Sequence, residues 1–499
     1  MSAIAFRNRR ELRTGLRAIA CSGMLALSLS AAAVAQAQTA TAPPATPPAA
    51  PAAAPPAKTS DGSLTWNGIT LYGIIDIGLQ FQTHGTPISD YFPAGTAEPL
   101  QKNSNGSVTA VTPSNLSQSR IGLSGNEPLA GDWAAVFRLE TFFNPQSGNL
   151  SDALKSIALN NGRALAYQTT NVDSSVAGQY FAGAAYIGFS SKTAGSYTFG
   201  RHVTPLADGI SKYDPMGAAQ AFSLIGFSGT YAGGGDTEDR RLDQSFKYTG
   251  KYGPIHLGGL YQFSGSSGTA NTAVQAQLGA EFGGFSADAF YSKKYNAVAA
   301  APMSVAQAQG LAALCNPPAG TPTPANGAQC FSVSNSLAST ISDNETYAVM
   351  GLYNFGTVKL YGAWEYIKFA DPKTPLPPGS ITIGGYILAY TNNTAYQFND
   401  KTLNVLWGGV KWTVMPDLDL TVAYYGYKQD SYGKVACGDR SASTCSGRYD
   451  VGSVLANYRL TKRFDLYLGS MYSRGENGVV NGFLNTNTLA TTAGVRFKF

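Results

Sequence analysis

From residue 64 to the end of the chain, apolar and polar residues alternate in stretches of about ten residues. In "ITLYGIIDIGLQF", Leu71 and Ile75 share one face of an extended chain, whereas Tyr72 and Asp76 share the other. A period of two is that of a β-strand, whose successive side chains point to opposite faces. About ten residues is also the length of a tilted strand that crosses a membrane.

Sixteen stretches show this alternation and are predicted to be strands. They span residues 64–82, 117–127, 132–143, 181–190, 195–203, 241–250, 254–264, 272–283, 285–295, 344–354, 357–369, 401–413, 418–429, 448–460, 463–474 and 488–499. The connections between them alternate short and long down the chain. Short ones include "SSKTAG", "GKYG" and "LTK", and one of the long ones covers residues 204–240.

A membrane explains both the alternation and the sorting of the connections. Lipid offers no hydrogen bonds, so spanning strands cannot leave an edge unpaired, and an even-numbered antiparallel barrel removes the edges. We therefore predict an all-β fold, a transmembrane antiparallel β-barrel of 16 strands with short periplasmic turns and long extracellular loops. A soluble β-sandwich is the alternative, but its strands are usually shorter and it would not sort its loops by length.

The final residues, "AGVRFKF", form the last predicted strand. This strand should close the barrel against the first one, 64–82, with Val495 and Phe497 facing lipid. Phe499 would then lie at the rim of the barrel, where aromatic side chains meet the membrane interface.

The composition suits strands that are apolar on one face only. Charged residues make up 13% of the chain, about half the usual share of a soluble domain, while Tyr (28) and Phe (24) are numerous. Beyond residue 35 there is no apolar run of about 20 residues, which a transmembrane helix would need.

The N-terminal region predicts export. Five arginines precede the apolar stretch "AIACSGMLALSLSAAAVA", and a small-x-small site ends at Ala35, so residues 1–35 are predicted to be a signal peptide. Cleavage after Ala37 and lipidation at Cys21 are the alternatives. Removal of this segment lowers the formal charge from +5 to +1, 30 basic against 29 acidic residues, and leaves no basic excess for nucleic acid.

Residues 36–62 are rich in Ala and Pro and contain nothing that could build a core. We predict a disordered, extended periplasmic segment that acts as a spacer. A tether that contacts peptidoglycan, or that blocks a pore mouth, is the alternative. Residues 63–499 would then form the barrel.

Four cysteines remain after export, as two local pairs: Cys315 with Cys330, and Cys437 with Cys445. In an oxidising compartment three connectivities are open, and we favour the local one because it needs no long-range fold. Zinc is the alternative, but the three histidines of the chain lie far from the cysteines in sequence. We therefore predict two disulfides, no metal and no cofactor.

Several segments also resemble the Gram-negative general porins, most closely the trimeric porins of β-proteobacterial type. "ITLYGIIDIGLQF" is similar to their first strand, "SRIGLSGNEPLAGDWAAVFRLETFFN" to the second and third strands with their turn, and "YTFGRHVTPLAD" to the fifth. Phe499, preceded by Val495 and Phe497, matches the family's C-terminal assembly signal. The resemblance covers about residues 64–499 and rests on the order and spacing of these segments.

The resemblance implies a water-filled barrel in outer-membrane lipid, assembled as a homotrimer, through which small hydrophilic solutes and ions diffuse passively. The third long loop, about 204–240, would fold inward and form the constriction. Asp208 and Asp214 are the acidic candidates on that loop. In the family such residues face a ladder of basic side chains on the barrel wall.

Arg120 and Arg201 match the wall arginines of the family, and Arg241 or its neighbour Arg240 is a third candidate. Simple alternation would point Arg201 outward, so an irregularity at Gly200 is required. Alternation by itself places five further side chains in the lumen. These are Tyr72, Asp76, Arg138, Glu140 and Lys247.

The chain departs from the family at Ile74 and Gly183, where several members carry a basic residue, so the basic ladder is thinner here. The inward loop also carries the apolar stretch "AAQAFSLIGFSG", which could pack on the wall. The sign of ion selectivity is therefore not transferred from the family.

Three other functions are the alternatives. An enzyme is not predicted, because no nucleophile–base motif is found and "DTEDRRLD" lacks the spacing of a calcium loop. A substrate-specific channel would show saturable flux. An envelope anchor, tethered through the Ala/Pro segment, would show no large steady conductance.

Overall fold

The computed structural model of the chain describes residues 64–93, 101–171, 175–225, 240–264, 272–315, 331–379 and 382–499. The predicted signal peptide, 1–35, and the predicted Ala/Pro segment, 36–62, lie outside the described residues.

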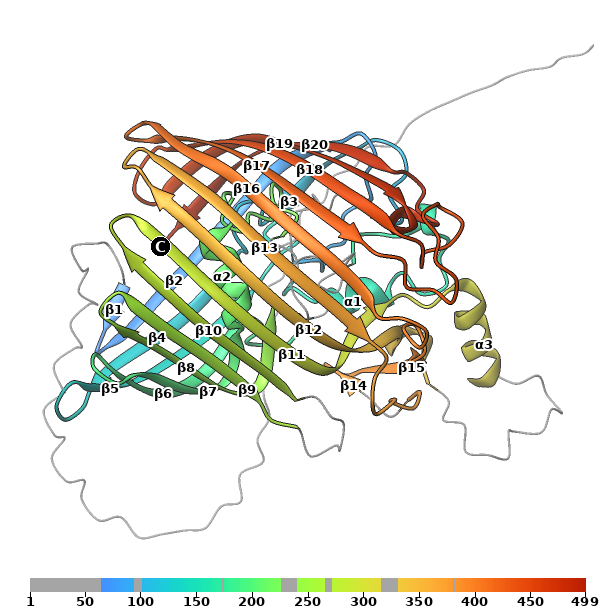
Figure 1. Cartoon of the computed structure of the whole chain (residues 1–499), viewed down its shortest axis with the longest axis horizontal. Coiled ribbons are helices and arrows are strands. Elements are labelled where there is room, and N and C mark those ends of the chain that lie inside the picture. Colours follow the sequence, from blue (N-terminus) through green and yellow to red (C-terminus); the bar gives the residue numbers. More distant parts are fainter. Residues whose placement is uncertain are drawn as a thin grey trace, which may run out of the picture. The chain divides into compact units, whose positions relative to one another are not determined.

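Sixteen antiparallel strands form a closed barrel, which confirms the predicted fold class (Figure 1). They are β2 (Ile69–Gln82), β4 (Arg120–Pro128), β5 (Trp133–Phe142), β6 (Ala184–Ser191), β7 (Gly195–Val203), β8 (Arg241–Tyr252), β9 (Ile255–Gln262), β10 (Ala273–Phe282), β11 (Phe285–Ala301), β12 (Ser336–Asn354), β13 (Val358–Ala370), β16 (Lys401–Met415), β17 (Leu418–Gln429), β18 (Gly447–Arg459), β19 (Phe464–Asn477) and β20 (Asn487–Lys498). Each pairs with the next, and β20 pairs with β2 to complete the ring.

The seam between β2 and β20 closes as predicted. Pairing runs along β2 from Ile74 to Gln82. Next to it, Gly73 and Phe499 exchange two backbone hydrogen bonds, with N···O distances of 2.9 and 3.1 Å. The short strand β1 (Leu64–Trp66) then pairs with the start of β2 on the same side. One side of β2 is thus covered by two segments placed end to end, β20 with Phe499 and then β1.

The predicted first strand, 64–82, is therefore two strands. Asn67, with a φ of 44°, and Gly68, with a φ of 76°, form the turn between β1 and β2. The other side of β2 is also shared, because β4 pairs with its first half and β3 (Val108–Pro113) with its second half. The prediction missed β3, which is a short segment within the long first loop.

The two faces of the barrel wall differ as the alternation predicts. In β17, Leu420, Val422 and Tyr424 are 38%, 56% and 45% exposed, whereas Thr421 and Tyr425 are 4% and 0% exposed. The exposed apolar side chains lie on the outer face, where lipid covers them. Among the described residues, no helix is long and apolar enough to cross a membrane.

Two strands extend furthest beyond their predicted bounds, since β11 continues to Ala301 and β12 already begins at Ser336. These extensions and the elements of the long loops together form a structure that we call the outer cap. The cap elements are α1 (Ala153–Ala158), η1 (Leu165–Tyr167), α3 (Val305–Cys315), η2 (Val333–Asn335), β14 (Thr382–Ile383) and β15 (Tyr386–Asn392). Figure 1 shows α3, β14 and β15 at the same end of the strands.

A separate apolar core holds the outer cap together. Leu154 and Ile157 of α1 pack with Leu337 and Ile341 of β12 and with Leu388 of β15. The strand β15 lies parallel to the extension of β12. Three loops that are far apart in sequence are therefore joined into one packed unit.

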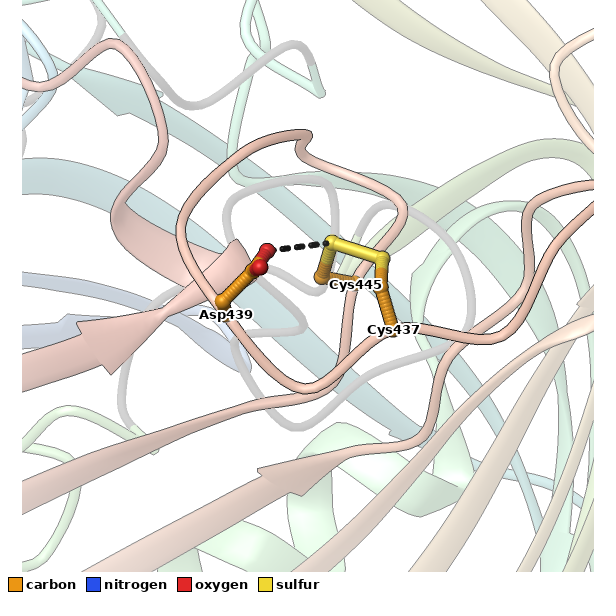
Figure 2. Close-up of side chains that lie close together, drawn as sticks. All are labelled: Cys437, Asp439 and Cys445. Carbon is orange, nitrogen blue, oxygen red and sulfur yellow. Dashed lines mark hydrogen bonds between the residues drawn. A yellow bond between two sulfur atoms is a disulfide. The ribbon is translucent and has the colours of Figure 1, made fainter.

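A disulfide joins Cys437 to Cys445 in the loop between β17 and β18, as predicted (Figure 2). Asp439 Oδ1 lies 3.4 Å from Sγ of Cys445. Because the two sulfur atoms are bonded to each other, neither is a thiolate that could bind a metal. The other predicted pair, Cys315 with Cys330, lies outside the described side chains, so it stays a prediction.

Deletion of residues 495–499 should prevent the barrel from closing. The deletion removes the partners of β2 from Gly73 to Ile77. Each backbone group left unpaired in hydrocarbon costs several kcal/mol. After refolding from urea into lipid vesicles, we expect little protease-resistant, heat-modifiable protein, whereas Lys498→Gln, which keeps the backbone, should refold like wild type. Equal folded yields for the deletion and wild type would contradict this closure.

The disulfide predicts a specific result in peptide mapping. Trypsin cleaves after Lys434, Arg440 and Arg448, which places Cys437 and Cys445 in two different peptides. Without reductant, peptides 435–440 and 441–448 should be found as one linked species by mass spectrometry, and reductant should separate them. Separate peptides in a sample alkylated before digestion and never reduced would show that the bond is absent.

Candidate functional site

The loop between β7 and β8 turns into the barrel directly after β7. Thr204 Oγ1 accepts a hydrogen bond from the backbone N–H of Ala207 at 3.2 Å and caps α2 (Pro205–Tyr213). Pro205 occupies the first turn of this helix, where its missing N–H costs nothing. The local sequence therefore starts a helix at the point where the chain leaves the wall.

This inward loop packs on the inner face of the strands from β11 to β19. Trp407 Nε1 donates to the carbonyl oxygen of Tyr213 at 3.2 Å, and Ser453 Oγ donates to that of Phe222 at 2.6 Å. From the loop, the packed apolar residues are Leu206, Ile210, Tyr213, Met216, Ala219, Ala221, Phe222, Leu224 and Ile225. From the wall they include Phe290, Met350, Ile367, Val405, Trp407, Tyr425 and Met471. The apolar stretch after α2 thus packs on the wall as far as Ile225.

A cavity of about 340 Å³ lies on the other side of α2, between the helix and the strands β4 to β8. Its charged lining residues are mostly basic. The basic residues are Arg120, Arg138, Arg240, Arg241 and Lys247, and the acidic ones are Glu140 and Asp208. The structure therefore brings together four of the five predicted basic wall residues and one of the two predicted acidic loop residues.

Three of the lining residues, Arg120, Arg138 and Glu140, form one network with Tyr72 on β2, β4 and β5. Arg138 Nη2 lies 2.5 Å from Glu140 Oε2, and Arg120 Nη1 lies 3.6 Å from Glu140 Oε1. Tyr72 donates its hydroxyl to Glu140 at 2.9 Å and accepts from Arg138 Nε at 2.7 Å. Two arginines therefore neutralise one buried carboxylate, and the network keeps one positive charge.

Lys247 connects the wall to the inward loop. Its Nζ lies 2.5 Å from Asp208 Oδ2 on α2 and also donates to the carbonyl oxygen of Val203 at 2.8 Å. Arg240 donates to Ser211 Oγ of the same helix at 3.1 Å. The exposed face of α2 is thus held against the basic wall by charge, while its other face is held by apolar packing.

The strand irregularity that Arg201 requires is present. Gly200 has a φ of 139°, and the register of β7 against β8 shifts between Gly200 and His202. Arg201 is consequently buried, and its guanidinium donates to the carbonyl oxygen of Ala182 at 3.0 Å and to Asp243 at 2.6 Å. It supports the second long loop and is not among the residues that line the cavity.

Asp214 is placed differently from the prediction. It follows α2 and is 2% exposed, with its carboxylate accepting from the Tyr425 hydroxyl at 2.5 Å and from the N–H of Ala218 at 2.7 Å. Because the chain turns against β17 after Tyr213, this carboxylate faces the opposite wall and not the basic one. Asp214 is an anchor of the loop rather than an acidic group of the cavity.

Asp76 points to the inside of the barrel, as alternation predicts, but it is fully buried. Its carboxylate accepts from the N–H groups of Leu116 and Ser117, both at 2.8 Å, and from the Tyr467 hydroxyl at 2.6 Å. The first long loop covers this side chain. Asp76 therefore points inward from β2, but its carboxylate is enclosed by the first long loop and by Tyr467.

His202 and Tyr186 are among the lining residues that were not predicted. His202 is buried, its ring stacks on that of Tyr186 with centroids 4.9 Å apart, and both residues line the cavity. Simple alternation already points His202 inward, so the irregularity at Gly200 is needed for Arg201 and not for His202. Arg241, which was predicted, lies over the ring of Phe142 at 4.6 Å.

A closed barrel with an inward loop and a basic inner wall defines an outer-membrane channel protein. The sequence profile of the Gram-negative porin family matches residues 23–478, so the chain belongs to this family. It is a porin of the Gram-negative outer membrane, and its activity is that of a channel and not of an enzyme.

Individual relatives agree with this assignment. An outer membrane porin protein of Bordetella pertussis is 24% identical over 439 residues, which covers 86% of this chain and 94% of that protein. The fold is similar to that of the anion-selective porin from Comamonas acidovorans, with a TM-score of 0.54, 16% identity, and coverage of 86% and 99% of the two chains. A loop-deletion mutant of OmpT from Vibrio cholerae gives a TM-score of 0.51 at 12% identity, with coverage of 86% and 99%. At these identities the two structures show a shared fold only.

Asp214→Asn should gain stability over wild type as the pH rises. Burial raises the pKa of the Asp214 carboxyl above its usual value, because the ionised form is poorly solvated there. Wild type therefore loses stability as the pH rises from the unfolded-state pKa through the raised folded-state pKa, whereas asparagine stays neutral. The difference between the thermal midpoints of variant and wild type, measured in detergent, should grow from pH 4 to pH 8. A difference that is constant or shrinks would contradict the buried placement.

Proposed function

We propose that the protein lets small hydrophilic solutes and ions diffuse passively across the outer membrane, with the inward loop, about 204–240, forming the constriction. The observation that supports this most directly is the one-sided packing of that loop. Its apolar face covers the wall from β11 to β19, and the cavity beside α2 lies along β4 to β8. A solute would therefore pass between α2 and the basic wall.

The chemistry of that space favours polar solutes. Positive charge on the wall and a carboxylate on the loop, as in Lys247 and Asp208, produce a field across the path. Water and solute dipoles align in such a field, so an apolar solute would have to displace ordered water. Charge selectivity then depends on the side chains that line the path.

We further propose a preference for anions. The cavity is lined by five basic and two acidic side chains, and Glu140 is already paired with two arginines. An anion that replaces water in this cavity is attracted by the guanidinium groups, whereas a cation is repelled by them. The charges on this chain carry this proposal, since the likeness to the Comamonas porin shows the fold alone.

Assembly as a homotrimer and the C-terminal assembly signal of Val495, Phe497 and Phe499 stay predictions from the resemblance. Contact of residues 36–62 with peptidoglycan stays an alternative that rests on the Ala/Pro composition of that segment. Phe497 is 36% exposed, and its ring lies near those of Phe464 and Phe499. This places an aromatic group on the outer surface at the end of β20, which is where such a signal would have to be read.

The selectivity can be tested with the double variant R120Q/K247Q in planar bilayers. Loss of both charges, together with an unpaired Asp208, should lower the chloride-to-potassium permeability ratio by roughly twofold or more, as derived from the reversal potential in a KCl gradient. The control is Arg448→Gln, which removes a charge from the outer face of β18, where Arg448 is paired with Asp450. A cation-preferring wild type, or equal reversal potentials for R120Q/K247Q and wild type, would refute the proposal.

A further inference from the structure

A second cavity, the cap pocket, lies in the outer cap and shares no lining residue with the cavity beside α2. Its volume is about 630 Å³, which lies within the range of about 300–1,000 Å³ that is usual for small-molecule sites. Its walls come from three parts of the chain that are distant in sequence. They are residues within 101–103, 163–171 and 299–307, together with Thr340.

The apolar part of the lining, which we call the apolar side, includes the end of β11, from Ala299 to Ala301, followed by Pro302 and Met303, and also Leu165. This side is held in place, because the N–H of Met303 donates to Asn161 Oδ1 at 2.8 Å and its carbonyl accepts from the N–H of Gly162 at 3.0 Å. The lining has no aromatic residue. A compact apolar group can therefore lie against a firm surface of small side chains.

The polar part of the lining, which we call the polar side, is positively charged. Lys102 and Arg163 are its charged residues, and the lining has no acidic residue. Both are exposed, and neither forms an ion pair with a residue in the described part of the chain. Side-chain amides complete this side. They belong to Gln101, Asn103, Gln168 and Asn171.

The N-terminus of α3 adds a third positive element. Ser304 Oγ accepts from the N–H of Gln307 at 3.2 Å, and Gln307 Oε1 accepts from the N–H of Ser304 at 2.9 Å, which together form a capping box. Both residues line the cap pocket with Val305. Since α3 is 11 residues long, the positive end of its dipole adds to the charges of Lys102 and Arg163.

We propose that the cap pocket binds a small organic carboxylate that has a compact apolar body. The carboxylate lies at Lys102 and Arg163, and the body lies against Ala299–Met303. An inorganic anion would leave the apolar side unused, and a neutral solute would leave two cations without a partner. Binding itself does not depend on the proposed diffusion, but its role, capture of a solute at the channel mouth, rests on that proposed function.

The test uses the full mature protein in detergent and sodium benzoate as the probe, with benzamide as its neutral counterpart and sodium phosphate as an inorganic anion. Isothermal titration and saturation-transfer NMR measure binding without any need for transport. We expect saturable binding of benzoate. Benzamide and phosphate should bind at least about tenfold more weakly, because benzamide lacks the negative charge and phosphate lacks the apolar body.

Two variants assign the binding to the cap pocket. K102Q/R163Q should weaken benzoate binding about tenfold or more, and Ala301→Trp should abolish it by filling the apolar side. The control K428Q/K434Q removes two charges from the neighbourhood of another extracellular loop and should bind benzoate like wild type. Gel mobility before and after heating checks that every variant is folded.

The proposal is overturned if wild type shows no saturable benzoate binding, if benzamide or phosphate binds as well as benzoate, or if both pocket variants bind benzoate like wild type. Conductance of the same samples in planar bilayers separates this result from the channel proposal. Normal conductance without benzoate binding would refute the cap pocket alone, whereas benzoate binding without conductance would refute the channel alone.

Discussion

Backbone hydrogen bonding at the seam between β2 and β20 is the interaction on which the rest of the structure depends. In lipid an unpaired peptide group has no partner, so the sheet is stable only as a closed ring. The chain meets this requirement along β2 with β20, Phe499 and β1 on one side and with β3 and β4 on the other. Everything inside the ring, including the inward loop, is positioned by a wall that must close.

The inward loop makes the interior asymmetric. Its apolar residues pack on the wall from β11 to β19. The charged face of α2 therefore points to Arg240 and Lys247. Low overall charge and a strongly basic path are therefore compatible, because five basic side chains line the cavity beside α2. The lining of the cavity beside α2 therefore depends both on the apolar stretch after α2, which holds the loop on the other wall, and on the arginines of β4 and β5.

The parts of the fold that were predictable are those in which one face of a strand meets lipid. There β7 and β17 have the predicted bounds 195–203 and 418–429, although the alternation of β7 is broken at Gly200. Beyond the membrane both faces of a strand can be covered by protein, so the end of β11, "NAVAAA", shows no alternation and was missed along with β3 and β15. In the candidate site, alternation placed Arg138 and Lys247, and the resemblance placed Arg120. Asp214 could not be placed, because its direction depends on contacts of the loop with a distant wall.

The disulfide in the loop between β17 and β18 has a consequence for biogenesis. Cys437 and Cys445 are separated by eight positions, so their bond can form in the oxidising periplasm without any help from the finished barrel. A loop oxidised before insertion has to traverse the bilayer as a covalent ring and not as a single thread. The opening formed by the assembly machinery must then be wide enough for both arms of this ring to cross side by side.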